Sequence, residues 1–179
     1  MAQPQYWDDI LYPSFRATIR GEYYGVIPQD FVDEECYNLA CRAIAKFKFP
    51  KISTDYTTFY GKWSTQEING VEQEVLLTVD EDDPDGIPHA YFNNELTYAE
   101  IEIIIAWMLV YWCQRQISNS DNFEDMYTDV NIKTYSRANA VDKNLKMLER
   151  YTDHARFLEN EYSRVNNDRR PTLGDVNNE

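Results

Sequence analysis

The sequence predicts a mainly α fold: a helical bundle with a long C-terminal helix, an inserted β-hairpin and extended terminal arms. Three patterns predict it: a capped apolar segment at residues 96–117, an apolar stripe of helical spacing within residues 130–165, and an Asn-Gly turn between two segments rich in β-forming residues. Because 179 residues is the size of one domain, we expect a single domain over residues 1–179.

The capped segment at residues 96–117 is the most informative part of the chain. Thr97 is followed three residues later by Glu100, which is the capping-box pattern that begins a helix. From Ile101 to Cys113 every residue except Glu102 is apolar or aromatic, so this helix must be covered on nearly all sides. It is too short to cross a membrane, because a membrane span needs about 20 apolar residues.

The remainder of the chain is expected to be too small and too polar to cover this helix fully. We therefore expect contacts with other copies of the chain, or with the long helix, to bury part of its surface. Large aromatic side chains are enriched in such contacts. The aromatic residues predicted to lie between subunits or in the core are Trp107, Tyr111 and Trp112.

The other helices and the two arms follow from spacing and from turn residues. Residues 1–28 lack a helical period and contain three prolines, so we expect an extended N-terminal arm with aromatic anchors. Residues 30–49 have apolar positions at steps of three and four and end before Pro50, which predicts a helix. The stripe within residues 130–165 predicts a long helix, and the polar residues 166–179 predict a flexible tail.

Residues 56–92 change from helical to alternating period and predict a hairpin followed by an acidic loop. The segments 63–68 and 71–79 flank Asn69-Gly70, which is the strongest short signal for a β-hairpin. We expect this hairpin to project from the helical body and to meet a neighbouring chain. The residues predicted to make that contact are Trp63, Ile68 and Val71.

The charge of the chain is strongly negative and unevenly placed. The net charge is −14, and residues 63–114 hold 11 acidic residues and no Lys or Arg. Such a surface repels a phosphate backbone, so we expect no specific binding of nucleic acid. Three cysteines without a CxxC pattern are interpreted as buried, reduced residues. No signal peptide or membrane-spanning segment is recognised, so we expect no contact with a membrane.

No catalytic or cofactor-binding motif is found, so the chain is predicted not to be an enzyme and to need no cofactor or metal. The acidic loop resembles a calcium loop only in part: aligning Gly86 with the glycine of an EF-hand puts Phe92 where a glutamate is required. A solvated acidic loop is therefore the better interpretation. His89 and His154 lie far apart in sequence and are interpreted as surface or hydrogen-bonded histidines.

Three segments together resemble a known family. They are FKFPK (47–51), LTYAEIEIIIAWMLVYWCQRQI (96–117) and IKTYSRANAVDKNLKMLERYTDHARFLENEYSRVN (132–166). They are similar to head-to-tail adaptor (neck ring) proteins of tailed bacteriophages, especially those of crAss-like phages. The resemblance implies a helical bundle with an inserted hairpin or loop and a C-terminal arm, in a dodecameric ring below the portal that forms part of the DNA channel.

On this resemblance we expect a structural virion protein at the phage neck, made in the host cytoplasm, that joins the portal to the tail. Its expected partners are further copies of itself in a homo-oligomeric ring, the portal protein, and tail or further neck proteins. DNA is expected to pass through the ring without specific binding. The residues of the tail expected to dock on the portal are Arg169, Arg170 and Leu173.

Two other classes of function remain open from the sequence. One is a small helical protein-binding or regulatory module with a single soluble partner, which differs from an adaptor by the small mass of its complex. The other is an enzyme with an unrecognised carboxylate site, which would show a deep pocket where several acidic groups have a raised pKa.

Overall fold

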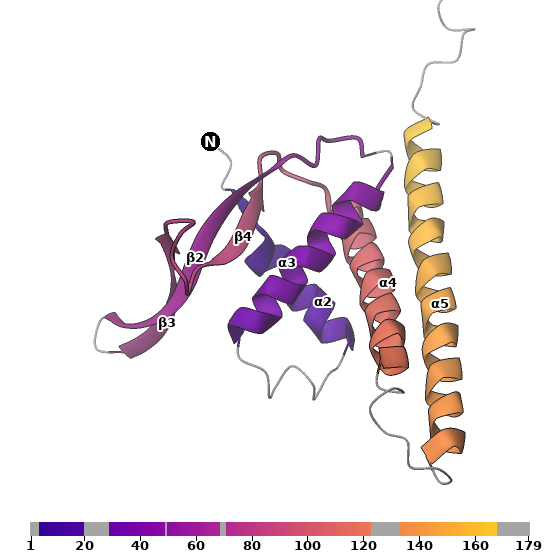
Figure 1. Cartoon of the computed structure of the whole chain (residues 1–179). Coiled ribbons are helices and arrows are strands. Elements are labelled where there is room, and N and C mark those ends of the chain that lie inside the picture. The colour runs from indigo at the N-terminus through magenta and orange to yellow at the C-terminus, as the bar shows by residue number, and fades with distance from the viewer. Residues whose placement is uncertain (1–3, 20–28, 49, 69–70, 123–132, 168–179) are drawn as a thin grey trace, which may run out of the picture.

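Figure 1 shows the computed structural model, which describes residues 4–19, 29–48, 50–68, 71–122 and 133–167. In chain order the elements are β1 (Gln5–Tyr6), α1 (Trp7–Ile10), α2 (Tyr12–Ile19), α3 (Gln29–Lys46), β2 (Tyr56–Ile68), β3 (Val71–Val79), β4 (Ile87–Phe92), α4 (Tyr98–Asn122) and α5 (Lys133–Asn167). The sheet lies on one side of α3, while α4 and then α5 lie on the other side (Figure 1).

The strands form one antiparallel sheet of four strands in the order β1-β4-β2-β3. The predicted fold class, a mainly α bundle, is therefore wrong, because the chain is a mixed α and β protein. The hairpin is only half of the sheet, and the signals for the other half in the sequence are weak. Strand β1 has two residues, and β4 contains Pro88, a residue type that is rare inside strands.

The N-terminal arm is the second correction. Residues 5–19 are not an extended arm, because they form β1, α1 and α2. Trp7, Tyr12 and Phe15 are fully buried and belong to the core. Helices of four and eight residues are too short to show a helical period in the sequence, which explains why they were missed. The rest of the predicted arm lies outside the described residues.

The predicted hairpin is present. Strands β2 and β3 pair over nine residue pairs, and the last pair, Ile68 with Val71, brackets the predicted Asn69-Gly70 turn. The first strand begins at Tyr56, earlier than the alternating pattern indicated. In Figure 1 the closed end of the hairpin points away from the helices. Helix α3 corresponds to the helix predicted at residues 30–49, but it ends at Lys46.

The cap of α4 forms as predicted. The backbone N–H of Thr97 donates to Glu100 Oε2 at 2.9 Å, and the N–H of Glu100 lies 3.4 Å from Thr97 Oγ1. Along this helix, Ile104 and Met108 are completely buried within the single chain. The neighbours α3, α5 and α2 thus bury most of this helix within one chain, more than expected, while Ile101, Ile105, Tyr111 and Trp112 stay partly exposed.

Helix α5 is the outermost layer and packs along α4 (Figure 1). It extends to Asn167, two residues into the predicted tail, while residues 130–132 of the predicted helix lie outside the described part. Ala155 is the fully buried residue of its inner side. Among the described helices, none has both the length and the apolar character that a membrane span requires.

Candidate functional site

The outer side of α5 exposes large apolar residues. Phe157 is 59% exposed and Val165 is 53% exposed. They lie eight residues apart, which separates them by about 80° around the helix axis and about 12 Å along it, so they border the same outer surface. Leu145 is 49% exposed but lies on a different side of the helix, about 120° away from Phe157. A cluster of exposed apolar side chains on an otherwise polar helix is typical of a contact surface.

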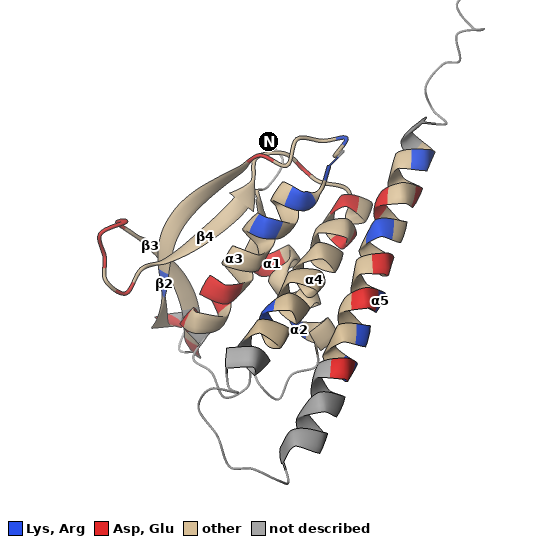
Figure 2. Cartoon of the chain, turned by 45° about the vertical axis from the view of Figure 1, so that its right-hand side comes forward, with Lys and Arg blue, Asp and Glu red and all other residues tan. Residues whose placement is uncertain are grey.

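The charge of α5 differs from that of the rest of the chain. Between Lys133 and Asn167 the sequence has seven basic and five acidic residues, whereas residues 63–114 have 11 acidic and no basic residues. Figure 2 shows basic and acidic positions alternating along α5, and acidic positions on the loop between β3 and β4. Over residues 142–165, whose side chains the structure describes, α5 has five basic and five acidic residues, so an edge of balanced charge faces away from a strongly acidic one.

A hollow lies on the hairpin side, between the first turn of α3, strand β2 and the loop that precedes β4. Its volume is about 560 Å³, and Phe31 at its rim is 66% exposed. Figure 1 shows that the hairpin and α5 lie at opposite sides of the molecule. The apolar residues that line the hollow are Phe31, Trp63, Pro84, Ile87 and Pro88.

Trp63 is held in place by the helical layer of its own chain. Its indole N–H donates to Asp33 Oδ2 at 2.8 Å, and Asp33 is buried with Arg16 at 3.8 Å. The side chain is half-buried, so one part remains available at the hollow. Of the three predicted hairpin contacts, the structure describes this side chain alone, because the side chains of Ile68 and Val71 lie outside its described part.

The acidic loop at the rim of the hollow is folded against β2. Lys62 Nζ donates to Asp83 Oδ2 at 2.8 Å, and Asp83 Oδ1 accepts the backbone N–H of Asp85. The hydrogen bond from Lys62 lowers the pKa of Asp83, and the same bond raises the pKa of Lys62. The loop closes with the N–H of Gly86 bonded to the carbonyl of Asp83. Among the described residues, no three potential metal ligands gather.

Glu100 joins α4, α5 and the segment before β2 at one buried point. Its Oε1 accepts the hydroxyl of Tyr162 at 2.6 Å and the backbone N–H groups of Lys51 and Ile52 at 3.2 and 3.1 Å. Burial alone would raise its pKa, but the hydrogen bonds from Tyr162, Thr97 and Ile52 outweigh burial and lower it. The charged carboxylate therefore fixes where α5 lies against the rest of the chain.

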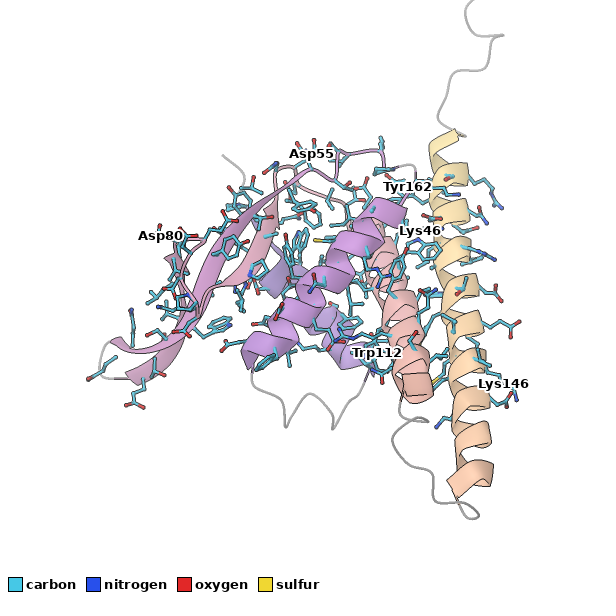
Figure 3. The ribbon with its side chains drawn as sticks, viewed as in Figure 1. Lys46, Asp55, Asp80, Trp112, Lys146 and Tyr162 are labelled. Atoms are coloured by element: carbon cyan, nitrogen blue, oxygen red, sulfur yellow. The ribbon has the colours of Figure 1, made fainter. Side chains whose placement is uncertain are left out.

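Tyr162 reaches from α5 toward the end of α3 (Figure 3). Its hydroxyl also accepts the N–H of Lys51 at 2.9 Å, and its ring lies 5.7 Å from that of Phe47, at the end of α3. The link from Tyr162 to Glu100 was not predicted from the sequence. A capping-box glutamate normally accepts hydrogen bonds from the start of its own helix. The sequence therefore carries no signal that Glu100 also accepts hydrogen bonds from α5 and from the segment before β2.

The three aromatic residues predicted on α4 lie within or beside the core of the single chain. Trp107 is buried, and Tyr111 and Trp112 are half-buried against the core. Lys46 Nζ lies 5.3 Å from the ring centroid of Trp107, and the guanidinium of Arg42 lies 4.8 Å from that of Tyr111. Of the two roles left open by the sequence, the core role therefore fits Trp107.

His89 and Asp8 form a buried pair that the sequence did not reveal. His89 is fully buried, and its Nδ1 lies 3.0 Å from Asp8 Oδ1. A carboxylate only accepts hydrogen bonds, so the histidine donates through Nδ1. The pair was missed because Asp8 belongs to α1, which was predicted as part of an extended arm. His154, by contrast, is exposed on α5.

Comparison of the chain with protein-family models, with curated proteins and with solved structures gives no match. The predicted portal-docking residues, Arg169, Arg170 and Leu173, lie outside the described residues. A function must therefore be inferred from the geometry of the two outer surfaces, from the charge pattern and from the similarity of three segments to head-to-tail adaptor proteins.

Proposed function

We propose that this chain is a structural virion protein, the head-to-tail adaptor of a tailed bacteriophage, which forms a homo-oligomeric ring between portal and tail. The observation that supports this most directly is the pair of unlike apolar surfaces at opposite sides of the chain. One is the side of α5 with Phe157 and Val165, and the other is the hollow beside Phe31 and Trp63. A closed ring needs two different, complementary surfaces on each subunit.

The charges of the two surfaces are compatible with the same contact. The described side chains of α5, residues 142–165, include five basic and five acidic residues, whereas the hollow is bordered by the acidic loop, residues 80–85. A helix of balanced charge meets this loop without the repulsion that contact of two acidic hollows would bring. We therefore propose that α5 of one copy packs on the hairpin side of the next copy, around the whole ring.

The remaining parts of this proposal concern DNA, portal and tail. A net charge of −14 lets DNA pass through a ring without adhering to it. The residues proposed to dock on the portal are Arg169, Arg170 and Leu173, and the further partners are tail or neck proteins. The expected result with duplex DNA near physiological salt is no measurable binding. A micromolar, salt-sensitive affinity would contradict the proposed channel.

The experiment that tests the ring combines the full chain with the portal protein from the same genome and images the product by electron microscopy. The proposal predicts a ring of this chain, of twelve copies if the resemblance holds in detail, on one end of the portal. The alternative of a small protein-binding or regulatory module predicts no such ring, and a compact complex of one chain with one partner.

A matched pair of variants tests which side of α5 makes the contact. Phe157→Ser removes the apolar side chain at the proposed interface, while Leu145→Ser removes an equally exposed apolar side chain on a different side of the helix. Phe157→Ser should abolish the ring, and Leu145→Ser should leave it intact. Equal effects of the two substitutions would contradict the proposed contact.

A further inference from the structure

A second cavity lies over the sheet, away from α5, and has a volume of about 580 Å³. Residues of β1, β2, β3, β4 and α1 all contribute to its wall. This volume lies within the range of ordinary ligand-binding sites. Its chemically distinctive lining consists of four aromatic residues and two carboxylates: Tyr6, Phe59, Trp63, Tyr91, Asp8 and Asp9.

Three of the aromatic rings lie next to one another, with Tyr6 edge to face with both Phe59 and Tyr91. The ring of Tyr6 lies 6.1 Å from that of Phe59 and 5.5 Å from that of Tyr91, and the last two are 6.4 Å apart. They come from three neighbouring strands that the register holds side by side. The face of an aromatic ring carries partial negative charge, so such a surface attracts cations.

The lining is held in position by buried groups behind it. The ring of His89 stacks on Phe59 with a centroid distance of 5.6 Å, and the same histidine donates to Asp8. Trp63 is fixed by its hydrogen bond to Asp33. Side chains fixed before binding lose little conformational freedom on binding, which favours a specific site over an incidental hollow.

The charge of the cavity is negative and is not balanced by its own wall. Asp8 and Asp9 both line it, and no Lys or Arg is found among the described lining residues. Within the described part of the chain, no ion pair involves Asp9. An anionic ligand would be repelled, and an apolar ligand would cover carboxylates without giving them a partner.

We propose that this cavity binds the guanidinium group of an arginine side chain presented by another polypeptide. A guanidinium is planar, so it stacks on aromatic rings while its N–H groups donate to a carboxylate. Both kinds of group line this cavity: the rings of Tyr6 and Tyr91, and the acidic residue Asp9. A lysine ammonium satisfies the charge but cannot stack. This site involves no residue of α5, although Trp63 also lines the hollow assigned to the ring.

The test uses the full chain and two short peptides that differ in one group. The first is acetyl-Gly-Gly-Arg-Gly-Gly-amide, and the second has citrulline in place of arginine, which keeps the shape and removes the charge. Binding is followed by the NMR signal of the Trp63 indole N–H and by the backbone amides of Asp8 and Asp9. The arginine peptide should shift these signals in a saturable way, and the citrulline peptide should not.

Variants separate the site from general attraction to an acidic protein. Asp9→Asn should weaken binding of the arginine peptide by about tenfold, since it removes a charged acceptor. Glu149→Gln removes the same charge from exposed α5 and should change nothing. Tyr6→Leu, at a residue 37% exposed, removes one ring without disturbing the core and should also weaken binding. Thermal unfolding of each variant verifies that the fold is intact.

Three results would overturn the proposal. Equal binding of the citrulline peptide would show that the charge is not recognised. Equal effects of Asp9→Asn and Glu149→Gln would show attraction to net charge alone. Absence of any saturable shift at millimolar arginine peptide would show that the cavity is not a binding site for this group, whatever the outcome of the ring experiments.

Discussion

The two long helices α4 and α5 lie side by side, yet they use their apolar residues in opposite ways. Helix α4 is apolar nearly all round, and the single chain buries most of it, including Ile104 and Met108. Helix α5 is far more polar, yet it leaves Phe157 and Val165 open to solvent. The most hydrophobic helix is therefore the one that its own chain covers best.

The difference between the two helices shows that exposure after folding, rather than hydrophobicity along the sequence, identifies assembly surfaces. A run of apolar residues shows that a helix is buried, but it does not show whether its own chain or another chain covers it. The informative feature is an apolar residue that remains exposed after folding. In this chain such residues include Phe157 on the outermost helix and Phe31 at the hairpin side, which lie on the surfaces assigned to the ring, and Tyr98 in the first turn of α4.

The largest effect on stability is expected on α4. Trp107→Ala should lower the free energy of unfolding by about 3–5 kcal/mol, because it empties the volume of a buried indole. Urea unfolding of the isolated chain at neutral pH measures this loss. A loss below about 1 kcal/mol would contradict the burial of α4 within one chain, and would return this helix to the list of partner surfaces.

The next effect is expected where the two helices are joined. Glu100→Gln should cost about 2 kcal/mol, because a charged acceptor of several hydrogen bonds becomes neutral. The pKa of Glu100 is lowered in the folded chain, so its charged form stabilises the fold. That contribution is complete above the pKa of an unfolded glutamate and is lost as the pH falls through the folded pKa.

The difference in stability between the native chain and Glu100→Gln should therefore shrink on acidification. Urea unfolding of both proteins at neutral pH and below pH about 4.3, the ordinary pKa of glutamate, measures it. Glu149→Gln, an exposed change on α5, serves as the control and should show no such pH dependence. A difference that stays constant down to strongly acidic pH would contradict the role of the charged carboxylate.

A smaller effect is expected for the tyrosine that attaches α5 to this junction. Tyr162→Phe keeps the ring beside Phe47 but removes the hydroxyl that donates to Glu100, which should cost about 1 kcal/mol. The backbone N–H of Lys51 also loses an acceptor, although it keeps Glu100. Hydrogen exchange should become faster in α5 and remain unchanged in the middle of α4. Uniform acceleration of both helices would show that they unfold as one unit.

The smallest effect on stability is expected at the exposed side of α5. Phe157→Ser should change the free energy of unfolding of the isolated chain by less than about 0.5 kcal/mol, because the ring is already in solvent. The two substitutions can be compared by their effects on the free energy of unfolding. Trp107→Ala should destabilise the fold, whereas Phe157→Ser should prevent only assembly. Strong destabilisation by Phe157→Ser would mean that the side chain belongs to the fold.

The sequence predicted the elements whose signals are local. The Thr97–Glu100 cap and the Asn69-Gly70 hairpin depend on residues a few positions apart, and both elements are present. Strand β4 and helices α1 and α2 were missed, because each is short and forms only against distant parts of the chain. The fold class was wrong for that reason.

The candidate surfaces were predictable only in part. Trp63 was singled out from its place in the hairpin, but its link to Asp33, thirty residues earlier, needed the tertiary structure. The cavity over the sheet is lined by Tyr6 of β1, Asp9 of α1 and Tyr91 of β4, which lie far apart in the sequence. No local pattern joins them, so the sequence contained no signal for this site.

In the proposed ring, α5 of one copy packs on the hairpin side of the next. Mixing two variants, each with one of these surfaces altered, tests this contact. Phe157→Ser disables one surface, and Phe31→Ser disables the other, so neither protein alone can form the contact. A mixture of the two retains one intact contact per pair. Mass measurement in solution should show no assembly of either variant alone, and pairs of one copy of each, about twice the 21.2 kDa chain, in the mixture. A mixture that remains entirely monomeric, while the native chain assembles, would contradict the claim.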